Sequence, residues 1–150
     1  MTQLDYFTVN GFALELLAKS TYHRQFPIGD YFRVEVLPAI WNHQVQFYLD
    51  DQGNPVAMVT WAWLNEAVEQ DIHATGRALT HDDWQCGNRL FFNDWITPYN
   101  NIREVLHDMT HNIFPDEVAT SLRRNPDGSV RRINRWTGIN LRASTEVSVA

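Results

Sequence analysis

Two polar residues in unusual settings indicate a catalytic pair. His23 lies in the sequence STYHRQFP and Asp94 in the sequence FFNDWITP. If the second segment is a strand, side chains alternate with a period of two, so Leu90, Phe92, Asp94 and Ile96 share one face. A carboxylate in such an apolar row needs a partner, because burying it unpaired costs on the order of several kcal/mol. An imidazole is a suitable partner, and the pair suggests an acyl-transfer site.

Ser20 lies three residues before His23, a spacing that brings a hydroxyl and an imidazole together on a helical turn. Two interpretations follow. Ser20 can complete a relay with His23 and Asp94, or it can simply cap or end a helix.

A second histidine pair gives a competing hypothesis. His107 and His111 are four residues apart in a segment expected to be helical, with Asp108 between them. Two histidines on one helical face can hold zinc while a neighbouring carboxylate acts as base, which would make the chain a metal-dependent hydrolase. No third ligand follows at the usual spacing, Asp116 being the nearest. Histidines in an amphipathic helix are more often surface residues.

The composition favours a single domain spanning residues 1–150. The chain has 150 residues, of which 44% are hydrophobic and 13% aromatic, enough for a substantial core. Its apolar runs are too short to cross a bilayer, and its start lacks the pattern of a secretory signal. We therefore expect a cytoplasmic protein without a membrane span and without a nucleic-acid partner.

Charge is distributed unevenly along the chain. From Arg123 onward there are 6 arginines against 2 acidic residues, although the whole chain has a net charge of −6. The arginines Arg131, Arg132 and Arg135 lie in a segment that reads as the second strand of a hairpin. Such a basic surface can attract an acidic partner and speed its association. Alternatively, the arginines are simply the solvent-exposed face of a strand and bind no partner.

The pattern of apolar residues predicts an α+β fold, a mixed sheet flanked by helices. Helices are expected over residues 4–19, 65–72 and 102–114. Residues 30–36 form a short segment between prolines, and residues 73–85 form a polar connection. Strands are expected over residues 45–49 and 55–63, over 90–96, and in a second hairpin of 117–124 with 129–136.

The sequence RWTGIN at 135–140 is the only candidate for a coenzyme A pyrophosphate loop, and it lacks the final small residue of such loops.

The order of several segments resembles the toxin-activating lysine acyltransferases, which mature RTX haemolysins and leukotoxins. The resemblance covers roughly residues 14–141. The segments that carry it are Ser20, His23, Arg24 and Pro27; residues 36–40; residues 55–57 with Trp61 and Ala62; Trp84, Gly87 and Arg89; residues 94–96 with Pro98; Phe114 and Pro115; and Leu122 with Arg123.

This resemblance implies a specific reaction. Members have a fold similar to the GNAT acetyltransferases and move a fatty acyl group from acyl-acyl carrier protein to internal lysine ε-amines of an RTX protoxin or related RTX protein, such as an adhesin. The family's histidine and aspartate fall on His23 and Asp94, and a family arginine linked to activity falls on Arg123. Acyl carrier protein is then the co-substrate, no bound cofactor is required, and the arginine-rich hairpin is its expected docking surface.

Some positions depart from the family pattern. Asn88 stands where an acidic residue is common, Asn93 replaces an aliphatic residue, and Asn100 stands where glycine is frequent. Residues 145–150 are β-prone, so the family's carboxyl-terminal helix is expected to be missing or much reduced. Without that helix, the formation of a homodimer and the docking of the protoxin are the properties expected to differ from the family. A further alternative is a non-catalytic escort of a secreted repeat protein, although such a binder has no use for His23 and Asp94.

Overall fold

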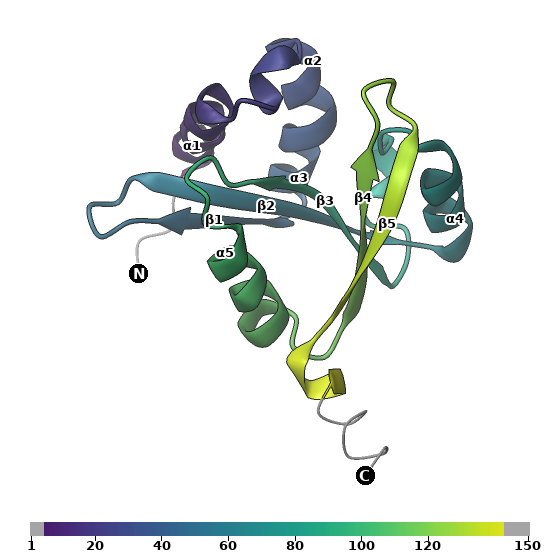
Figure 1. Ribbon diagram of the computed structural model, residues 1–150. Coiled ribbons are helices and arrows are strands. Elements are labelled where there is room, and N and C mark those ends of the chain that lie inside the picture. The colour runs from purple at the N-terminus through teal and green to yellow at the C-terminus, as the bar shows by residue number, and fades with distance from the viewer. Residues whose placement is uncertain (1–4, 143–150) are drawn as a thin grey trace.

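The computed structural model describes residues 5–142 as a five-stranded mixed sheet with helices on both faces (Figure 1). The strands follow one another in chain order across the sheet, and neighbours are antiparallel except β3 and β4, which are parallel. The strands are β1 Val45–Leu49, β2 Pro55–Leu64, β3 Arg89–Ile96, β4 Val118–Arg124 and β5 Val130–Thr137. The predicted α+β architecture and both hairpins are confirmed.

The sheet is flanked by α-helices and by short helical turns. The α-helices are α1 Tyr6–Lys19, α2 Ile28–Tyr31, α3 Leu37–Trp41, α4 Glu66–Thr75 and α5 Ile102–Asp108. Short 3₁₀ turns are η1 His23–Gln25 and η3 His81–Asp83, and π-helical turns are η2 Phe32–Val36 and η4 Met109–Ile113. The helix expected over 4–19 begins with Asp5 as its N-cap, and residue 4 lies outside the described residues, as do 145–150.

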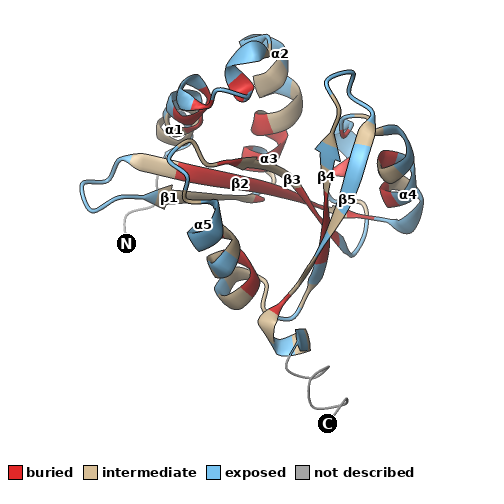
Figure 2. Cartoon of the chain, in the orientation of Figure 1, coloured by how far each residue is buried: buried red, intermediate tan, exposed pale blue. Residues whose placement is uncertain are grey.

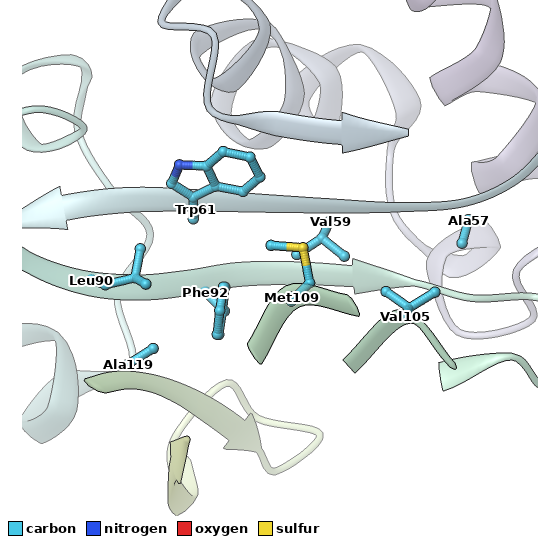
Figure 3. Packing of buried hydrophobic residues seen from close by; sticks show 8 residues of the cluster. All are labelled: Ala57, Val59, Trp61, Leu90, Phe92, Val105, Met109 and Ala119. Carbon is cyan, nitrogen blue, oxygen red and sulfur yellow. The ribbon is translucent and has the colours of Figure 1, made fainter. Parts of the chain in front are cut away.

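Three hydrophobic clusters hold these layers together. On one face, β2 and β3 pack against Val105 of α5 and Met109 of η4, as Figure 3 shows. On the other face, Leu16 of α1 lies in a cluster with Ile96, and Ile72 of α4 lies in a cluster with Phe91. Figure 2 shows that buried residues run along β2 and β3, so the sheet's centre is the core. Each large apolar side chain buried here contributes about 1.5–3 kcal/mol.

A β-bulge at Asn93 changes the predicted alternation of β3. Trp61 pairs with Phe92 but the preceding residue, Thr60, pairs with Asp94, so Asn93 is an extra residue in the ladder. Leu90 and Phe92 consequently belong to the cluster on the α5 face, whereas Asp94 and Ile96 lie on the α1 face. The prediction that all four residues share one face is therefore wrong, because a bulge shifts the alternation by one residue.

The segment after Pro27 is helical, which the sequence analysis did not predict. Helix α2, the π-turn η2 and helix α3 follow one another without interruption from residue 28 to residue 41. Pro27 is the N-cap of α2. Pro38 has no backbone N–H to donate, and it lies shortly after the π-turn η2, where the regular α-helical hydrogen bonding is already interrupted. Helix α4 also runs to Thr75, past the predicted end at residue 72, and ends at Gly76 in the left-handed conformation.

Strands β3 and β4 pair over only a short length. Their parallel ladder joins residues 90–92 to residues 119–121, and beyond it the two strands separate (Figure 1). The next residues on the two strands are Asn93 and Asp94 on β3 and Leu122 to Arg124 on β4. This divergence opens the sheet beside Asp94. Among the described residues, no helix is long and apolar enough to span a membrane.

Candidate active site

His23 is positioned by the end of α1. Ser20 is the C-cap of this helix, and its backbone N–H donates to the carbonyl oxygens of Leu16 and Leu17. The chain then makes the short turn η1, in which His23 is the first residue, and the imidazole points back toward the sheet. The predicted position of His23 after a helix end is confirmed. The residue is nevertheless buried, with only 6% of its surface exposed.

The imidazole of His23 binds two partners at once. Its Nε2 lies 3.0 Å from Oδ1 and 3.1 Å from Oδ2 of Asp94. Its Nδ1 lies 2.5 Å from the Ser20 hydroxyl, whose oxygen also accepts the His23 backbone N–H at 3.3 Å. An ionised carboxylate only accepts hydrogen bonds, so Nε2 carries a proton and neutral His23 accepts the Ser20 hydroxyl at Nδ1.

The arrangement therefore brings together Ser20, His23 and Asp94 in the order of a hydroxyl, an imidazole and a carboxylate. The backbone of Ser20 ends α1, as one interpretation predicts, and its side chain contacts the imidazole, which is the geometry that a relay would need. The side chain of His23 is 4% exposed and that of Asp94 19% exposed, so the carboxylate is the more accessible member of the pair.

Aromatic rings enclose the imidazole. The ring of Tyr22 meets His23 edge to face at 5.0 Å, and Tyr31 does so at 5.7 Å. Phe26 stacks on Tyr31 at 5.5 Å. Burial, together with the charge of Asp94, raises the pKa of Tyr22, so its phenol stays neutral at physiological pH. The rings lower the local polarity and so strengthen the electrostatic coupling between His23 and Asp94.

Two cavities meet at Asp94. One, of about 240 Å³, opens toward α2 and η2, where Phe26, Tyr31 and Glu35 line it. The other, of about 330 Å³, lies between β3 and β4 and includes His23, Leu122 and Arg123. A reacting group in either cavity can approach Asp94, and one in the second cavity can also approach His23.

A third cavity borders the second on the side of α5. It has a volume of about 250 Å³ and shares Trp95, Leu122 and Arg123 with the second cavity. Its further lining includes Ile102 and Leu106 of α5 and Trp136 of β5. A cavity with a mainly apolar lining thus borders the more polar cavity that holds the histidine and carboxylate.

A comparison with known protein families shows the family of this chain. A sequence model of the RTX toxin acyltransferase family matches residues 2–137, nearly the whole chain. The chain belongs to this family. The acyltransferase predicted from the sequence is confirmed, and so is the resemblance on which that prediction rested.

Individual members of the RTX toxin acyltransferase family are similar over most of the chain. The RTX-I toxin-activating lysine-acyltransferase ApxIC of Actinobacillus pleuropneumoniae is 34% identical over 91% of this chain and 77% of its own length. A protein-lysine myristoyltransferase HlyC of Escherichia coli is 34% identical over 82% and 71%, respectively. The leukotoxin-activating lysine-acyltransferase LktC serotype A11 of Mannheimia haemolytica is 32% identical over 94% and 83%.

The arginines predicted from the sequence occupy two distinct places in this family member. Arg123 is exposed and lines both cavities between β3 and β4, close to the candidate pair. Arg131, Arg132 and Arg135 are exposed on the edge strand β5. Arg135 also lies near enough to His73 that its charge, after the larger effect of burial, helps lower the pKa of that imidazole.

The competing metal site finds little support. The rings of His107 and His111 stack on each other at 3.7 Å, and Nδ1 of His111 lies 2.9 Å from the carbonyl oxygen of His107. Asp108 accepts the Tyr48 hydroxyl at 2.6 Å and does not join them. Within residues 5–142, no group of three or more His, Cys, Asp or Glu side chains is arranged to hold a metal ion.

Three residues at the site were not predicted as functional. Glu35, Asn93 and Arg124 line the cavity on the α2 side together with Asp94. Asn93 had been noted only as a departure from the family pattern. One signal was available for each of the first two: an asparagine interrupts the apolar strand before Asp94, and a glutamate stands between Val34 and Val36.

Proposed function

We propose that this acyltransferase moves a fatty acyl group from acyl-acyl carrier protein to internal lysine ε-amines of an RTX protoxin or a related RTX protein. The observation that carries the proposal is the His23–Asp94 pair beside the opening between β3 and β4. The family members named above are lysine acyltransferases, and two of them are named for activating a toxin.

The acceptor amine sets the chemical requirement. The ordinary pKa of a lysine ammonium is about 10.4, so at neutral pH nearly all of it is protonated and has no lone pair for attack. A base must remove a proton. Imidazole is the side chain most often used for this purpose, and His23 is the base that the site offers. Asp94 holds the imidazole in one tautomer and stabilises the imidazolium that forms.

The reaction is an acyl transfer from sulfur to nitrogen. The lysine nitrogen attacks the thioester carbon, the amide bond forms, and the carbon–sulfur bond breaks with its electron pair leaving on the thiolate. The ammonium loses two protons in total, one before attack and one as the amide forms. One proton neutralises the thiolate and the other passes to solvent. His23 accepts and returns these protons.

Ser20 determines how a proton reaches His23. In the free enzyme Nε2 is bonded to Asp94, so the lone pair that accepts a proton is at Nδ1, where the Ser20 hydroxyl donates. A proton can therefore pass through Ser20, or Ser20 can move aside. A covalent acyl intermediate on His23 or Ser20 is the mechanistic alternative, and rapid quenching with intact mass measurement of the enzyme distinguishes it from direct transfer.

The donor and its docking follow from charge. Acyl carrier protein is acidic and presents its acyl chain on phosphopantetheine, so it requires no pyrophosphate loop. Arg123 borders the cavities beside His23, and Arg131, Arg132 and Arg135 on β5 offer a basic surface on the same hairpin. The apolar lining by Trp95, Leu106 and Trp136 suits the acyl chain. The reaction needs no resident cofactor, and we place it in the cytoplasm, where this donor occurs.

The decisive experiment is intact mass spectrometry of a candidate RTX substrate after incubation with the enzyme and acyl-acyl carrier protein. The expected result is a mass increase of one acyl group per modified lysine. His23→Gln is the matched control, since it retains a side chain that can hydrogen bond but cannot act as a base. Unmodified substrate with intact donor would favour a non-catalytic escort. Zinc-dependent hydrolysis of the donor or the substrate, without acyl addition, would favour the metal-dependent hydrolase.

A further inference from the structure

The cavity on the α2 side of Asp94 has a composition unlike that of the cavities between β3 and β4. Two carboxylates, Glu35 and Asp94, line it together with the rings of Tyr22, Phe26 and Tyr31. Its volume of about 240 Å³ is below the roughly 300–1,000 Å³ of typical small-molecule sites, which suits a single side chain.

Glu35 is held in this cavity by two local irregularities. It lies in the π-turn η2, in which the helix carries an extra residue per turn and side chains are displaced from their regular positions. Its Oε2 accepts a hydrogen bond of 2.6 Å from Nδ2 of Asn93, the bulged residue of β3. A carboxylate has about four lone-pair sites, so this bond leaves acceptor capacity for another donor.

The charges favour a cation. Within the lining of this cavity, the carboxylates of Glu35 and Asp94 are opposed by one guanidinium, that of Arg124, whose Nε donates to the carbonyl oxygen of Gly76 at 3.0 Å. Arg123 lines the neighbouring cavity and not this one. His23 contributes no charge when it is neutral. Because part of the cavity wall is apolar, the excess negative charge is less screened than it would be in water.

The rings complete a site for an alkylammonium group. Phe26 and Tyr31 stack with their planes 9° apart, and Tyr22 meets Phe26 edge to face at 5.2 Å. Aromatic faces attract ammonium groups and pack well against methylene groups. The phosphate of a phosphopantetheine arm and a fatty acyl chain are both poorly matched to a cavity with two carboxylates.

We propose that this cavity binds the acceptor lysine, with Glu35 and Asp94 accepting from the ammonium and Tyr22, Phe26 and Tyr31 packing on its methylene groups. The inference rests on the proposed function, to which it adds separate entrances for the two substrates. The lysine enters beside η2, and the acyl chain lies between β3 and β4. The two meet at Asp94, which lines both cavities.

The first test measures acyl transfer by the intact enzyme with the acceptor and donor concentrations varied separately. Glu35→Gln retains an oxygen for the bond from Asn93 but removes the charge. We expect KM for the acceptor to rise about tenfold while KM for the donor is unchanged. Glu104→Gln, an exposed glutamate on α5, is the matched control and should behave as wild type. An unchanged acceptor KM in Glu35→Gln would overturn the proposal.

The second test does not depend on acyl transfer. Nα-acetyl-lysine methylamide and its norleucine analogue, which lacks the ammonium, are titrated into the enzyme while the ring resonances of Tyr22 and Tyr31 are followed by NMR. Selective shifts with the lysine compound, lost in Glu35→Gln and kept in Glu104→Gln, would support the cavity even if no RTX protein were acylated. Equal shifts with both compounds, or lysine-selective shifts that persist in Glu35→Gln, would overturn it.

Discussion

Asp94 pairs with Thr60 across the β2–β3 ladder, although a regular ladder continuing from the Trp61–Phe92 pair would place Asn93 there. This single extra residue turns Asp94 to the face where α1 ends, and its carboxylate meets His23 at 3.0 Å. The same bulge directs Asn93 to Glu35. One irregularity in β3 therefore positions both the candidate catalytic carboxylate and the support for the proposed lysine cavity.

Asp94→Asn should reduce turnover by about two or more orders of magnitude with little change in donor binding. The amide oxygen can still accept the Nε2 proton of His23, but it carries no charge to stabilise the imidazolium. Steady-state kinetics with acyl-acyl carrier protein and a protoxin fragment measures both parameters. A folded variant that transfers acyl groups at the wild-type rate would rule out the pairing.

His23→Ala should abolish acyl transfer, because it removes the proposed base. Its burial means that this variant also leaves a small void, so His23→Gln is the necessary second variant. We expect both to lose at least about 10²-fold in turnover, while circular dichroism shows a native spectrum for the glutamine variant. Substantial turnover by folded His23→Gln would contradict the base assignment.

Ser20→Ala separates the two roles of Ser20. The helix end depends on the backbone N–H of Ser20, which alanine keeps, whereas the hydroxyl bonded to Nδ1 of His23 is lost. If the hydroxyl carries protons, turnover should fall about 10- to 100-fold with the thermal midpoint lowered only slightly. A turnover loss no larger than the loss in folded fraction would assign Ser20 a structural role alone.

The sequence was sufficient to predict the strands, the hairpins and the catalytic candidates. Each strand alternates or carries β-branched and aromatic residues, and the turn at residues 125–128 has the composition that favours a hairpin. The His23–Asp94 contact agrees with the prediction that the carboxylate in this apolar segment needs a partner, and with the family resemblance, although the face assumed for Asp94 was wrong. The Ser20–His23 contact followed from their spacing of three.

The bulge and the π-turn could not be predicted, because both depend on contacts distant in the sequence. The register of β3 is decided by packing against β2, so the correct face of Asp94 is a tertiary property. Residues 28–41 contain Pro38 and several β-branched residues, which disfavour a helix locally. Packing of Val36 and Ile40 against α1 outweighs this preference. Glu35 was missed for the same reason.

Asp83 should make stability depend on pH. Burial raises the pKa of this carboxyl, but hydrogen bonds from Arg77 and Thr80 outweigh the effect and bring the pKa below the ordinary 3.8. Its stabilisation is therefore present above pH 3.8 and is lost as the pH falls through the lowered value.

Asp83→Asn tests this directly. It should lower the free energy of unfolding by about 1 kcal/mol at pH 7, as loss of a helix cap does, and by much less near pH 2. Urea titration at the two pH values measures the difference, with the exposed neighbour in Asp82→Asn as control. An equal loss at both pH values would show that the charge of Asp83 is not responsible.

Charge reversal at Arg131 and Arg132 should slow association with acyl-acyl carrier protein more than it slows the chemical step. Both residues are exposed on the edge strand β5, and exposed charges attract a partner over roughly 10 Å at 0.1 M salt. The wild-type association rate should therefore fall steeply with salt, and the rate of the doubly reversed variant should be low and nearly independent of salt. Arg103→Glu, a charge reversal at an exposed residue of α5, is the control.

Acyl-coenzyme A, which has no acidic protein surface, should be a poor donor for the wild-type enzyme. Use of acyl-coenzyme A at the same efficiency, or salt-independent use of the carrier protein, would remove electrostatic docking from the mechanism while leaving the His23–Asp94 chemistry in place.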